Sequence, residues 1–235
     1  MKLSVIIPAF NEQHYLETVL ASVKRIVIPG VDLEIIVVDD GSTDRTYQIA
    51  ERLLDTNTDF LIKHHRNLGK GRALKSASAV VSGDFVIIQD ADLEYSPEEI
   101  PRVVRPLIEN FADVVYGSRF SGSEAKRVLY FWHATGNRVL TLISNVFSNL
   151  NLTDMETGYK AFTADVFKSL NLNERGFGVE PEITAKISKM GLRIFEVSVS
   201  YRGRTYEEGK KIGWKDGFWA LWCILRYSVA KCNTA

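Results

Sequence analysis

The sequence is poor in cysteine, lacks a long apolar run and carries no excess of charge of either sign. Its two cysteines, Cys223 and Cys232, lie near the C-terminus without the spacing of a metal site, which argues against a disulfide framework and favours a reduced, cytoplasmic environment. No apolar run approaches the roughly 20 residues needed to span a bilayer. The apolar run at residues 3–7 is too short for a signal peptide and leads directly into Pro8. We therefore expect a cytoplasmic protein that is at most peripheral to a membrane.

The charge balance also limits the partners. The 29 Lys and Arg residues equal the 29 Asp and Glu residues, so no overall field attracts nucleic acid, and an anionic ligand must be held by local groups. With 235 residues, of which 46% are hydrophobic, the chain can bury a sizeable core. No linker, internal repeat or low-complexity tract divides it. We expect a single domain over residues 1–235 and no nucleic-acid partner.

The first half of the chain predicts strands that alternate with helices. Several short apolar runs are too continuous to have a solvent-exposed face, which is typical of parallel strands buried on both sides. These runs are residues 3–7, 33–38, 60–62, 85–88 and 114–116. Apolar residues follow helical spacing at 15–23 and 49–54, and Ser96, Pro97 and Glu99 combine an N-cap with a capping box. The pattern predicts an α/β fold with a Rossmann-like, doubly wound, mostly parallel sheet.

After residue 117 the pattern changes to longer helices. An apolar-rich helix is expected around residues 128–150 and another near 181–190, with a strand at 194–199 and a C-terminal helical extension. We expect this second half to pack onto the first as one unit.

The most informative feature is the pair of carboxylates Asp90 and Asp92, which follows the predicted strand at 85–88. Because the strand opens into a loop there, both carboxylates can turn toward one ion. Hard oxygen ligands suit Mg²⁺ or Mn²⁺, which keep several waters and take one or two protein carboxylates together with substrate phosphates. The alternative is a solvated pair of aspartates at a strand end. A metal held there can bind a diphosphate.

Two further polar loops follow predicted strands. Residues 8–12 could set the aromatic edge of Phe10 and the carboxylate of Glu12 against a nucleobase or ribose, although a helix cap explains the same pattern. At 39–44, capping does not explain two consecutive acids, which makes Asp40 the better functional candidate. Ligands of doubly wound sheets bind beyond the carboxyl ends of the strands, where all three loops lie.

Four motifs, in this order, resemble a known family. They are VIIPAFNE at 5–12, VVDDGSTD at 37–44, NLGKG at 67–71 and DADL at 90–93. Together they resemble the inverting glycosyltransferases of family 2, which have a GT-A fold, and within it the polyprenyl-phosphate sugar transferases such as dolichyl-phosphate mannose or glucose synthases. The likeness continues through residues 117–120, 154–162, 176–182 and 204–210. It therefore spans nearly the whole chain.

The resemblance implies transfer of a hexose, with inversion, from a UDP- or GDP-sugar to a polyprenyl phosphate of the dolichyl or undecaprenyl type, with Mg²⁺ or Mn²⁺ as cofactor. It implies that residues 1–120 bind the nucleotide sugar and residues 121–235 the acceptor. The implied contacts are Pro8, Phe10, Glu12, Val38, Asp40 and Lys70 for the donor, Asp90 and Asp92 for the metal with Ala91 beside them, and Arg119, Arg204 and Lys210 for the phosphates.

Two departures from the family pattern leave the donor sugar open. The family often has Tyr where this chain has Phe10, which removes a hydroxyl contact to the nucleotide. Mannose synthases commonly carry Gln or His after the Asp-x-Asp-Leu motif, and this chain has Glu94 and Tyr95 there.

Elementary chemistry agrees with the implied reaction. Positive charge develops at the anomeric carbon while negative charge moves onto the diphosphate, so a divalent ion and cationic side chains stabilise the transition state. We expect Asp92, as a metal ligand, to contribute to catalysis together with the cations of Arg119, Arg204 and Lys210. Arg204 and Lys210 lie in a Gly-punctuated segment, 202–211, that could close over the donor. The alternative for this segment is a solvated charged loop.

The acceptor decides whether a protein base is needed. A lipid monophosphate is ionised at neutral pH and attacks directly, whereas a hydroxyl on a glycan needs a carboxylate to remove its proton. Asp154, Glu180 and Glu182 are the available acids, and each either orients other groups or acts as that base. Arg127 and Arg138 are candidates for the acceptor phosphate or are surface cations. A third hypothesis is a sugar-nucleotide-binding protein without turnover.

The C-terminal helix gives a hint about the acceptor. One helical stripe is apolar and consists of Trp214, Phe218, Leu221, Trp222, Leu225 and Val229. Trp219, Cys223 and Tyr227 make the opposite side largely apolar too, so one face needs a partner beyond the core. That partner is a membrane surface, where Trp and Tyr are favoured, or a second copy in a homodimer; the remaining alternative is a domain core.

Overall fold

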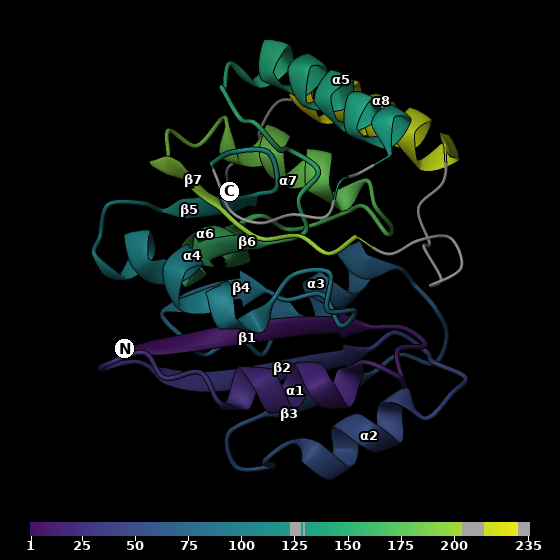
Figure 1. The fold of residues 1–235 in the computed structure, drawn as a ribbon, viewed down its shortest axis with the longest axis vertical. Helices are drawn as coiled ribbons and strands as arrows, with labels where there is room; N and C mark the ends of the chain where they lie inside the picture. Colours follow the sequence, from purple (N-terminus) through teal and green to yellow (C-terminus); the bar gives the residue numbers. More distant parts are fainter. Residues whose placement is uncertain (123–127, 129, 204–213, 230–235) are drawn as a thin grey trace.

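The computed structural model describes residues 1–122, 128, 130–203 and 214–229. Within them, seven strands form one sheet in the order β3-β2-β1-β4-β6-β5-β7. The strands are β1 (Lys2–Ala9), β2 (Asp32–Asp39), β3 (Phe60–Lys63), β4 (Phe85–Ile88), β5 (Val114–Ser118), β6 (Lys160–Thr163) and β7 (Ile194–Ser198). Strands from both halves of the chain therefore share one sheet (Figure 1).

The sheet is mostly parallel, as the sequence predicts. β1 pairs in parallel with β2 and β4, β2 with β3, and β5 with β7. The exception is β6, which runs antiparallel to both of its neighbours, β4 and β5. The sequence pattern does not predict β6, because its first residue, Lys160, is charged but fully buried and so interrupts the apolar run.

Most helices lie where the periodicity predicts them. They are α1 (Leu16–Lys24), α2 (Thr46–Leu53), α4 (Ile100–Ile108), α5 (Phe131–Ser148), α7 (Val179–Ile187) and α8 (Trp214–Val229). The pattern does not predict α3 (Lys70–Ser78) or α6 (Ala164–Ser169). The buried face of α3 consists of Gly71, Ala73, Leu74 and Ala77, so small residues conceal its amphipathic period.

The sheet separates two hydrophobic clusters, one on each face. Leu3, Val5 and Ile7 of β1 belong to the cluster that contains α1 and α4, whereas Ile6 belongs to the cluster that contains α3, α6 and α7. Successive side chains of a strand point to opposite faces, and all four are fully buried. This two-sided burial explains the continuous apolar runs and confirms the α/β class.

The predicted capping box at Ser96 is wrong. Ser96 makes no side-chain capping hydrogen bond, and a 3₁₀ turn, Pro97–Glu99, precedes α4. The Glu99 carboxylate instead accepts hydrogen bonds from the backbone N–H of Ser200, at 3.0 and 3.2 Å, and from its hydroxyl at 2.9 Å. Glu99 thus ties α4 to the segment after β7, a long-range contact that local pattern cannot reveal.

Helices α5 and α8 lie side by side and both contact α7, at the end of the molecule far from α1 and α2 (Figure 1). On α8, Cys223 and Tyr227 are buried, but Trp219 of the same predicted side is 48% exposed, and the predicted apolar stripe is exposed over much of its length. Its exposed members are Phe218, Trp222, Leu225 and Val229, and α5 adds Phe131, Trp132, Val139, Leu142 and Val146. Among the described residues, no helix is both long and apolar enough to cross a membrane.

Candidate active site

A cavity of about 350 Å³ lies at the carboxyl ends of β1, β2 and β4. The structure brings the three predicted polar loops together around it. The lining residues are Pro8, Ala9, Phe10, Glu12, Asp40, Asn67, Gly69, Lys70, Ala73, Asp90, Ala91, Asp92, Glu94, Gly176, Phe177 and Tyr201. This is the edge where ligands of doubly wound sheets bind.

Asp40, directly after β2, organises the loop that leads into α3. Its Oδ1 accepts hydrogen bonds from His64 Nδ1 at 2.6 Å and from the backbone N–H of Leu68 at 3.0 Å. Its Oδ2 accepts one from the backbone N–H of Gly69 at 2.7 Å. The other ring nitrogen of His64 lies 2.8 Å from Ser76 Oγ on α3. These bonds hold Asp40 at the wall of the cavity and fix the start of α3 beside it.

Lys70, the first residue of α3, points at the first aspartate of the Asp-x-Asp motif. Its Nζ lies 2.8 Å from Asp90 Oδ1 and 3.2 Å from Glu180 Oε1. Glu180 in turn pairs with the fully buried Lys160, which also donates to the carbonyl of Met155. Burial alone would lower the pKa of Lys70, but the charges of Asp90 and Glu180 outweigh it and raise the pKa above its ordinary value. The ammonium therefore stays charged at any working pH.

Gly158 makes this close approach possible. A Cβ at this position would lie 2.3 Å from Asp90 Oδ2 and 2.8 Å from Lys70 Nζ. Contacts that short do not occur between real atoms, so any larger residue displaces the carboxylate and the ammonium together.

We expect Gly158→Ala to push the carboxylate of Asp90 and the ammonium of Lys70 out of position and so to weaken Mn²⁺ binding, with a small effect on the free energy of unfolding because both atoms are the ends of flexible side chains. Gly136→Ala is the matched control, because nothing lies within 4 Å of that position in α5. There the change should stabilise the fold by up to about 1 kcal/mol, as alanine is the better helix former. Calorimetric titration with Mn²⁺ and thermal unfolding of both variants check this; equal Mn²⁺ affinities would contradict it.

Asp90 and Asp92 fit a divalent metal by their chemistry. Both line the cavity, and the Asp90 side chain is 23% exposed and already carries a cation, Lys70, on one oxygen. Asp92 Oδ1 accepts the backbone N–H of Glu94 at 3.1 Å, across a turn in which Leu93 has a φ of 60°. Among the described residues, no three His, Cys, Asp or Glu side chains gather as a complete metal cluster. Two carboxylates are a donor set typical of Mg²⁺ or Mn²⁺ completed by water and phosphate.

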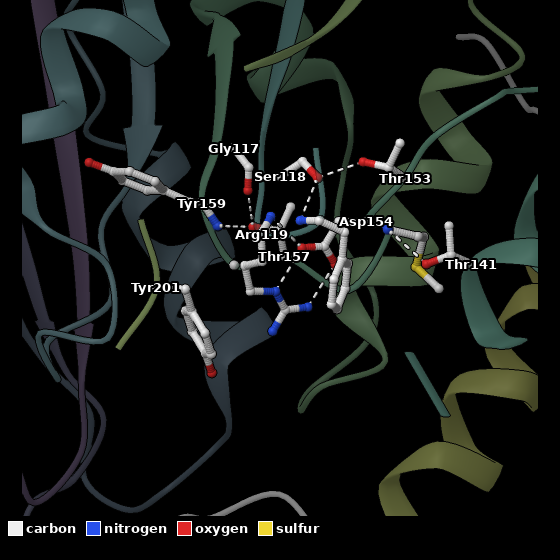
Figure 2. Close-up of polar contacts among 12 residues, drawn as sticks. Gly117, Ser118, Arg119, Thr141, Thr153, Asp154, Thr157, Tyr159 and Tyr201 are labelled. Carbon is white, nitrogen blue, oxygen red and sulfur yellow. Dashed lines mark hydrogen bonds and ion pairs between the residues drawn. The ribbon is translucent and has the colours of Figure 1, made fainter. Parts of the chain in front are cut away.

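Arg119 and Asp154 form a buried ion pair (Figure 2). Asp154 Oδ2 accepts from Arg119 Nε at 2.7 Å and from its backbone N–H at 3.0 Å, and Oδ1 accepts from Nη2 at 2.7 Å. Asp154 is fully buried and Arg119 is 8% exposed. Neither residue lines the cavity; the guanidinium lies 5.1 Å from the ring of Tyr201, which does. Arg119 therefore lies next to a residue of the cavity wall, Tyr201, and not in the wall itself.

The structure places two further predicted residues away from the cavity. Val38 is fully buried in the cluster on the α3 side of the sheet. Glu182 is also fully buried, and its carboxylate accepts the backbone N–H groups of Asn173 and Glu174, each at 2.8 Å, and pairs with Lys186 at 2.6 Å. Their predicted contacts to donor or acceptor remain predictions. Glu182 supports the loop before α7.

The same loop connects α8 to the cavity. Glu174 accepts hydrogen bonds from the Trp219 indole at 3.2 Å and from the Tyr227 hydroxyl at 2.7 Å, both on α8. Gly176 and Phe177, two and three residues further along, line the cavity. The sequence pattern does not single out Phe177 or Tyr201 as lining residues. The one signal in this part of the sequence is the Gly-Phe-Gly run at 176–178, which is typical of a loop whose backbone packs closely against a neighbouring segment or a ligand.

Glu156 is a half-buried acid that the predicted site does not include. Its Oε1 is buried without a hydrogen bond from the described residues. Burial, together with the charge of Glu180, raises the pKa of Glu156 to about 7. It therefore exchanges a proton near neutral pH.

Several predicted cations fall in other parts of the chain. Arg204, Lys210 and Arg127 lie outside the described residues. Arg138 on α5 lies 6.0 Å from the ring of Phe120, and Arg119 lies 5.5 Å from the same ring. Two guanidinium groups thus approach one aromatic ring.

Known proteins with similar sequences include lipid-linked sugar transferases. The Glycosyl transferase family 2 model matches residues 4–170, well over half of the chain. A dolichol-phosphate mannosyltransferase from Pyrococcus furiosus is 30% identical over 216 residues, which cover 90% of this chain and 61% of that protein. A UDP-N-acetylglucosamine–dolichyl-phosphate N-acetylglucosaminyltransferase from Methanococcus voltae is 27% identical over 246 residues, which cover 97% of this chain and 96% of that protein. The chain thus spans about three fifths of the first relative and nearly all of the second.

Solved structures show the same fold. Glucosyl-3-phosphoglycerate synthase from Mycobacterium tuberculosis, crystallised with Mn²⁺, uridine diphosphate and glucosyl-3-phosphoglycerate, superposes with a TM-score of 0.73 at 24% identity, covering 99% of this chain and 81% of that chain. The predicted GT-A fold is confirmed. With its family model matched over residues 4–170, the chain belongs to glycosyl transferase family 2.

Proposed function

We propose that the protein transfers a hexose, with inversion, from a UDP- or GDP-sugar to a polyprenyl phosphate, with Mg²⁺ or Mn²⁺ held by Asp90 and Asp92. One observation carries the proposal: both carboxylates and the cation of Lys70 line the same cavity as Phe10 and Asp40, so a nucleoside and a diphosphate can be bound side by side. The relatives named for dolichyl phosphate support the acceptor.

Different residues of the cavity are suited to different parts of the donor. Pro8, Phe10 and Glu12 offer an apolar wall and a carboxylate for the base and ribose. A divalent ion on the Asp90 and Asp92 carboxylates would supply positive charge to the leaving diphosphate. Lys70 supplies a fixed positive charge beside it, in a cavity that partly excludes water and so strengthens the attraction.

The positions of three acids favour an acceptor that is already ionised. Asp154 pairs with Arg119, Glu180 with Lys160 and Lys70, and Glu182 with Lys186. None of these three acids lines the cavity, so none is placed to take a proton from an acceptor hydroxyl there, and a lipid monophosphate needs no base.

A second candidate function is transfer to a hydroxyl of a glycan in cell-surface polysaccharide synthesis. Glu156 favours it, since a pKa of about 7 is what a general base requires. Glu156 does not line the cavity in this structure, and for that reason we place this candidate second.

The products of one assay test these alternatives. The protein is incubated with radiolabelled UDP-glucose, UDP-N-acetylglucosamine or GDP-mannose, with Mn²⁺ or Mg²⁺, and with or without polyprenyl phosphate. Label in the organic extract only when polyprenyl phosphate is present supports the proposal, and a water-soluble product with an added glycan supports the second candidate. Donor binding without any product would show a binding protein and overturn both.

A peripheral location at the cytoplasmic face follows from the proposed acceptor. The exposed apolar surface of α5 and α8, defined by the residues named above, is suited to a bilayer interface, where aromatic side chains are favoured. We expect Phe218→Ser combined with Trp222→Ser to weaken binding to liposomes severalfold. The control is Phe111→Ser, a residue 59% exposed just after α4, which should bind lipid like the unchanged protein.

Cosedimentation with vesicles of anionic lipid measures the effect, and the molar mass in solution is recorded beside it. Unchanged sedimentation of the double variant would remove the membrane from the proposal. A dimer that the same variant converts to a monomer would instead assign this surface to a homodimer contact.

A further inference from the structure

Lys70 is the first residue of a helix and has little freedom. Gly69 precedes it with a φ of 92°, and Gly71 N donates to the carbonyl of Arg175 at 2.8 Å. A Cβ on Gly69 or Gly71 would lie 2.2 or 2.1 Å from a backbone oxygen of the neighbouring loop, so the two chain segments are in direct contact. The Lys70 side chain is 14% exposed. Its ammonium is therefore a fixed charge rather than a mobile surface group.

The four charges in this chain of ion pairs are balanced. Lys70 and Lys160 contribute two positive charges, and Asp90 and Glu180 contribute two negative charges. Lys160 is fully buried against Glu180 and two backbone carbonyls, so among the described residues Lys70 is the cation paired with Asp90. A divalent ion on Asp90 and Asp92 adds two positive charges beside the Lys70 ammonium.

We propose that Lys70 is an internal counter-ion that holds Asp90 until donor arrives, so that divalent metal binding depends on the nucleoside diphosphate. The inference rests on the proposed function, because it needs a metal on Asp90. It goes beyond a phosphate-binding role for Lys70, since it assigns the residue an effect on metal affinity when no phosphate is present.

The physical reason is that the metal and the Lys70 ammonium compete for the Asp90 carboxylate until a diphosphate takes over the ammonium. An ion at Asp90 must share the carboxylate with an ammonium 2.8 Å from one of its oxygens, and like charges in a partly desolvated site repel strongly. A diphosphate removes the conflict, because its oxygens accept the ammonium and ligate the metal. Since coupling between two ligands is reciprocal, the metal must strengthen nucleotide binding by the same factor.

The test measures Mn²⁺ binding to the full chain by electron paramagnetic resonance, without nucleotide and with UDP or GDP. Lys70→Met removes the charge and keeps the aliphatic stem, and Lys70→Gln keeps a polar tip in case the first variant folds poorly. Without nucleotide, we expect both to bind Mn²⁺ about tenfold more tightly than the unchanged protein, within the usual range of coupling between sites. With nucleotide, the variants should no longer bind Mn²⁺ more tightly, because the Lys70 charge that they lack also binds the diphosphate.

Lys75→Met is the matched control. It removes one positive charge from the same helix, but Lys75 bonds to Asn171 at 3.2 Å on the exposed side. Its Mn²⁺ affinity should match that of the unchanged protein, which separates a local effect from a change in net charge.

The outcomes separate the inference from the function on which it rests. If the unchanged protein binds Mn²⁺ more tightly with nucleotide but the Lys70 variants bind it no more tightly than that protein without nucleotide, the counter-ion role is wrong and the proposed function stands. If the unchanged protein binds no Mn²⁺ under either condition, the proposed metal site is wrong and both fail.

Discussion

Asp92→Asn should reduce sugar transfer by about a thousandfold and leave the fold intact. The carboxylate is one of the two, with that of Asp90, that we assign to the metal in the cavity, and loss of several kcal/mol of charge stabilisation on the leaving diphosphate corresponds to such a factor. The fold should survive because an asparagine oxygen can still accept the backbone N–H of Glu94 that Asp92 accepts at 3.1 Å. Initial rates at saturating donor, together with thermal unfolding, provide the measurement.

Asp84→Asn is the control for this change. Asp84 lies just before the other end of β4, where its Oδ2 accepts the backbone N–H of Lys2 at 2.8 Å. The substitution removes one carboxylate next to the same strand but far from the cavity, so the variant should transfer sugar at the rate of the unchanged protein. If Asp92→Asn were as active as Asp84→Asn, the metal would not be bound where we place it.

Asp154→Asn should have the largest effect on stability. Arg119 would keep its charge even though burial lowers the pKa of its guanidinium and the charge of Asp154 that now raises it would be lost, because a guanidinium is not deprotonated in proteins. Breaking one partner of a buried ion pair leaves the other charge uncompensated, which costs about 3–5 kcal/mol. For a domain of this size the midpoint of thermal unfolding should fall by roughly 6–20 °C.

Asp113→Asn gives a matched comparison at the surface. Asp113 accepts the same three hydrogen bonds from Arg193, from the backbone N–H at 2.8 Å, Nε at 3.1 Å and Nη2 at 2.7 Å. The Arg193 side chain is 48% exposed, however, and water can replace the lost partner. We expect a cost of about 1 kcal/mol or less. Equal costs for the two variants in chemical denaturation would show that burial of the Arg119 pair adds nothing.

The fold could be predicted from the sequence where burial leaves a local signature. The runs that contain Ile6 and Ile36 are apolar throughout because both faces of β1 and β2 are covered, and this continuity alone indicates a parallel sheet. Strand β6 left no such signature. Its Lys160 is buried only because Glu180, twenty residues later, compensates the charge, and a pairing of that kind cannot be read from periodicity.

The candidate site was predictable in part for a similar reason. Asp40, Asp90 and Asp92 each follow a strand at the same edge of a parallel sheet, so position along the chain already places them together. The sequence cannot show that Asp40 bonds to His64 or that Lys70 lies on Asp90, since both contacts depend on how the loop before α3 folds back. Val38 follows the motif pattern but points into the core.

Removal of the metal tests the central claim most directly. Radiolabelled donor and polyprenyl phosphate are incubated with the protein after treatment with a chelator, and again after Mn²⁺ is restored in excess. We predict that label in the organic extract disappears with the chelator and returns with the ion, and that UDP or GDP binding weakens and recovers in parallel. Undiminished transfer to lipid in the presence of the chelator would contradict the assignment of Asp90 and Asp92 as metal ligands.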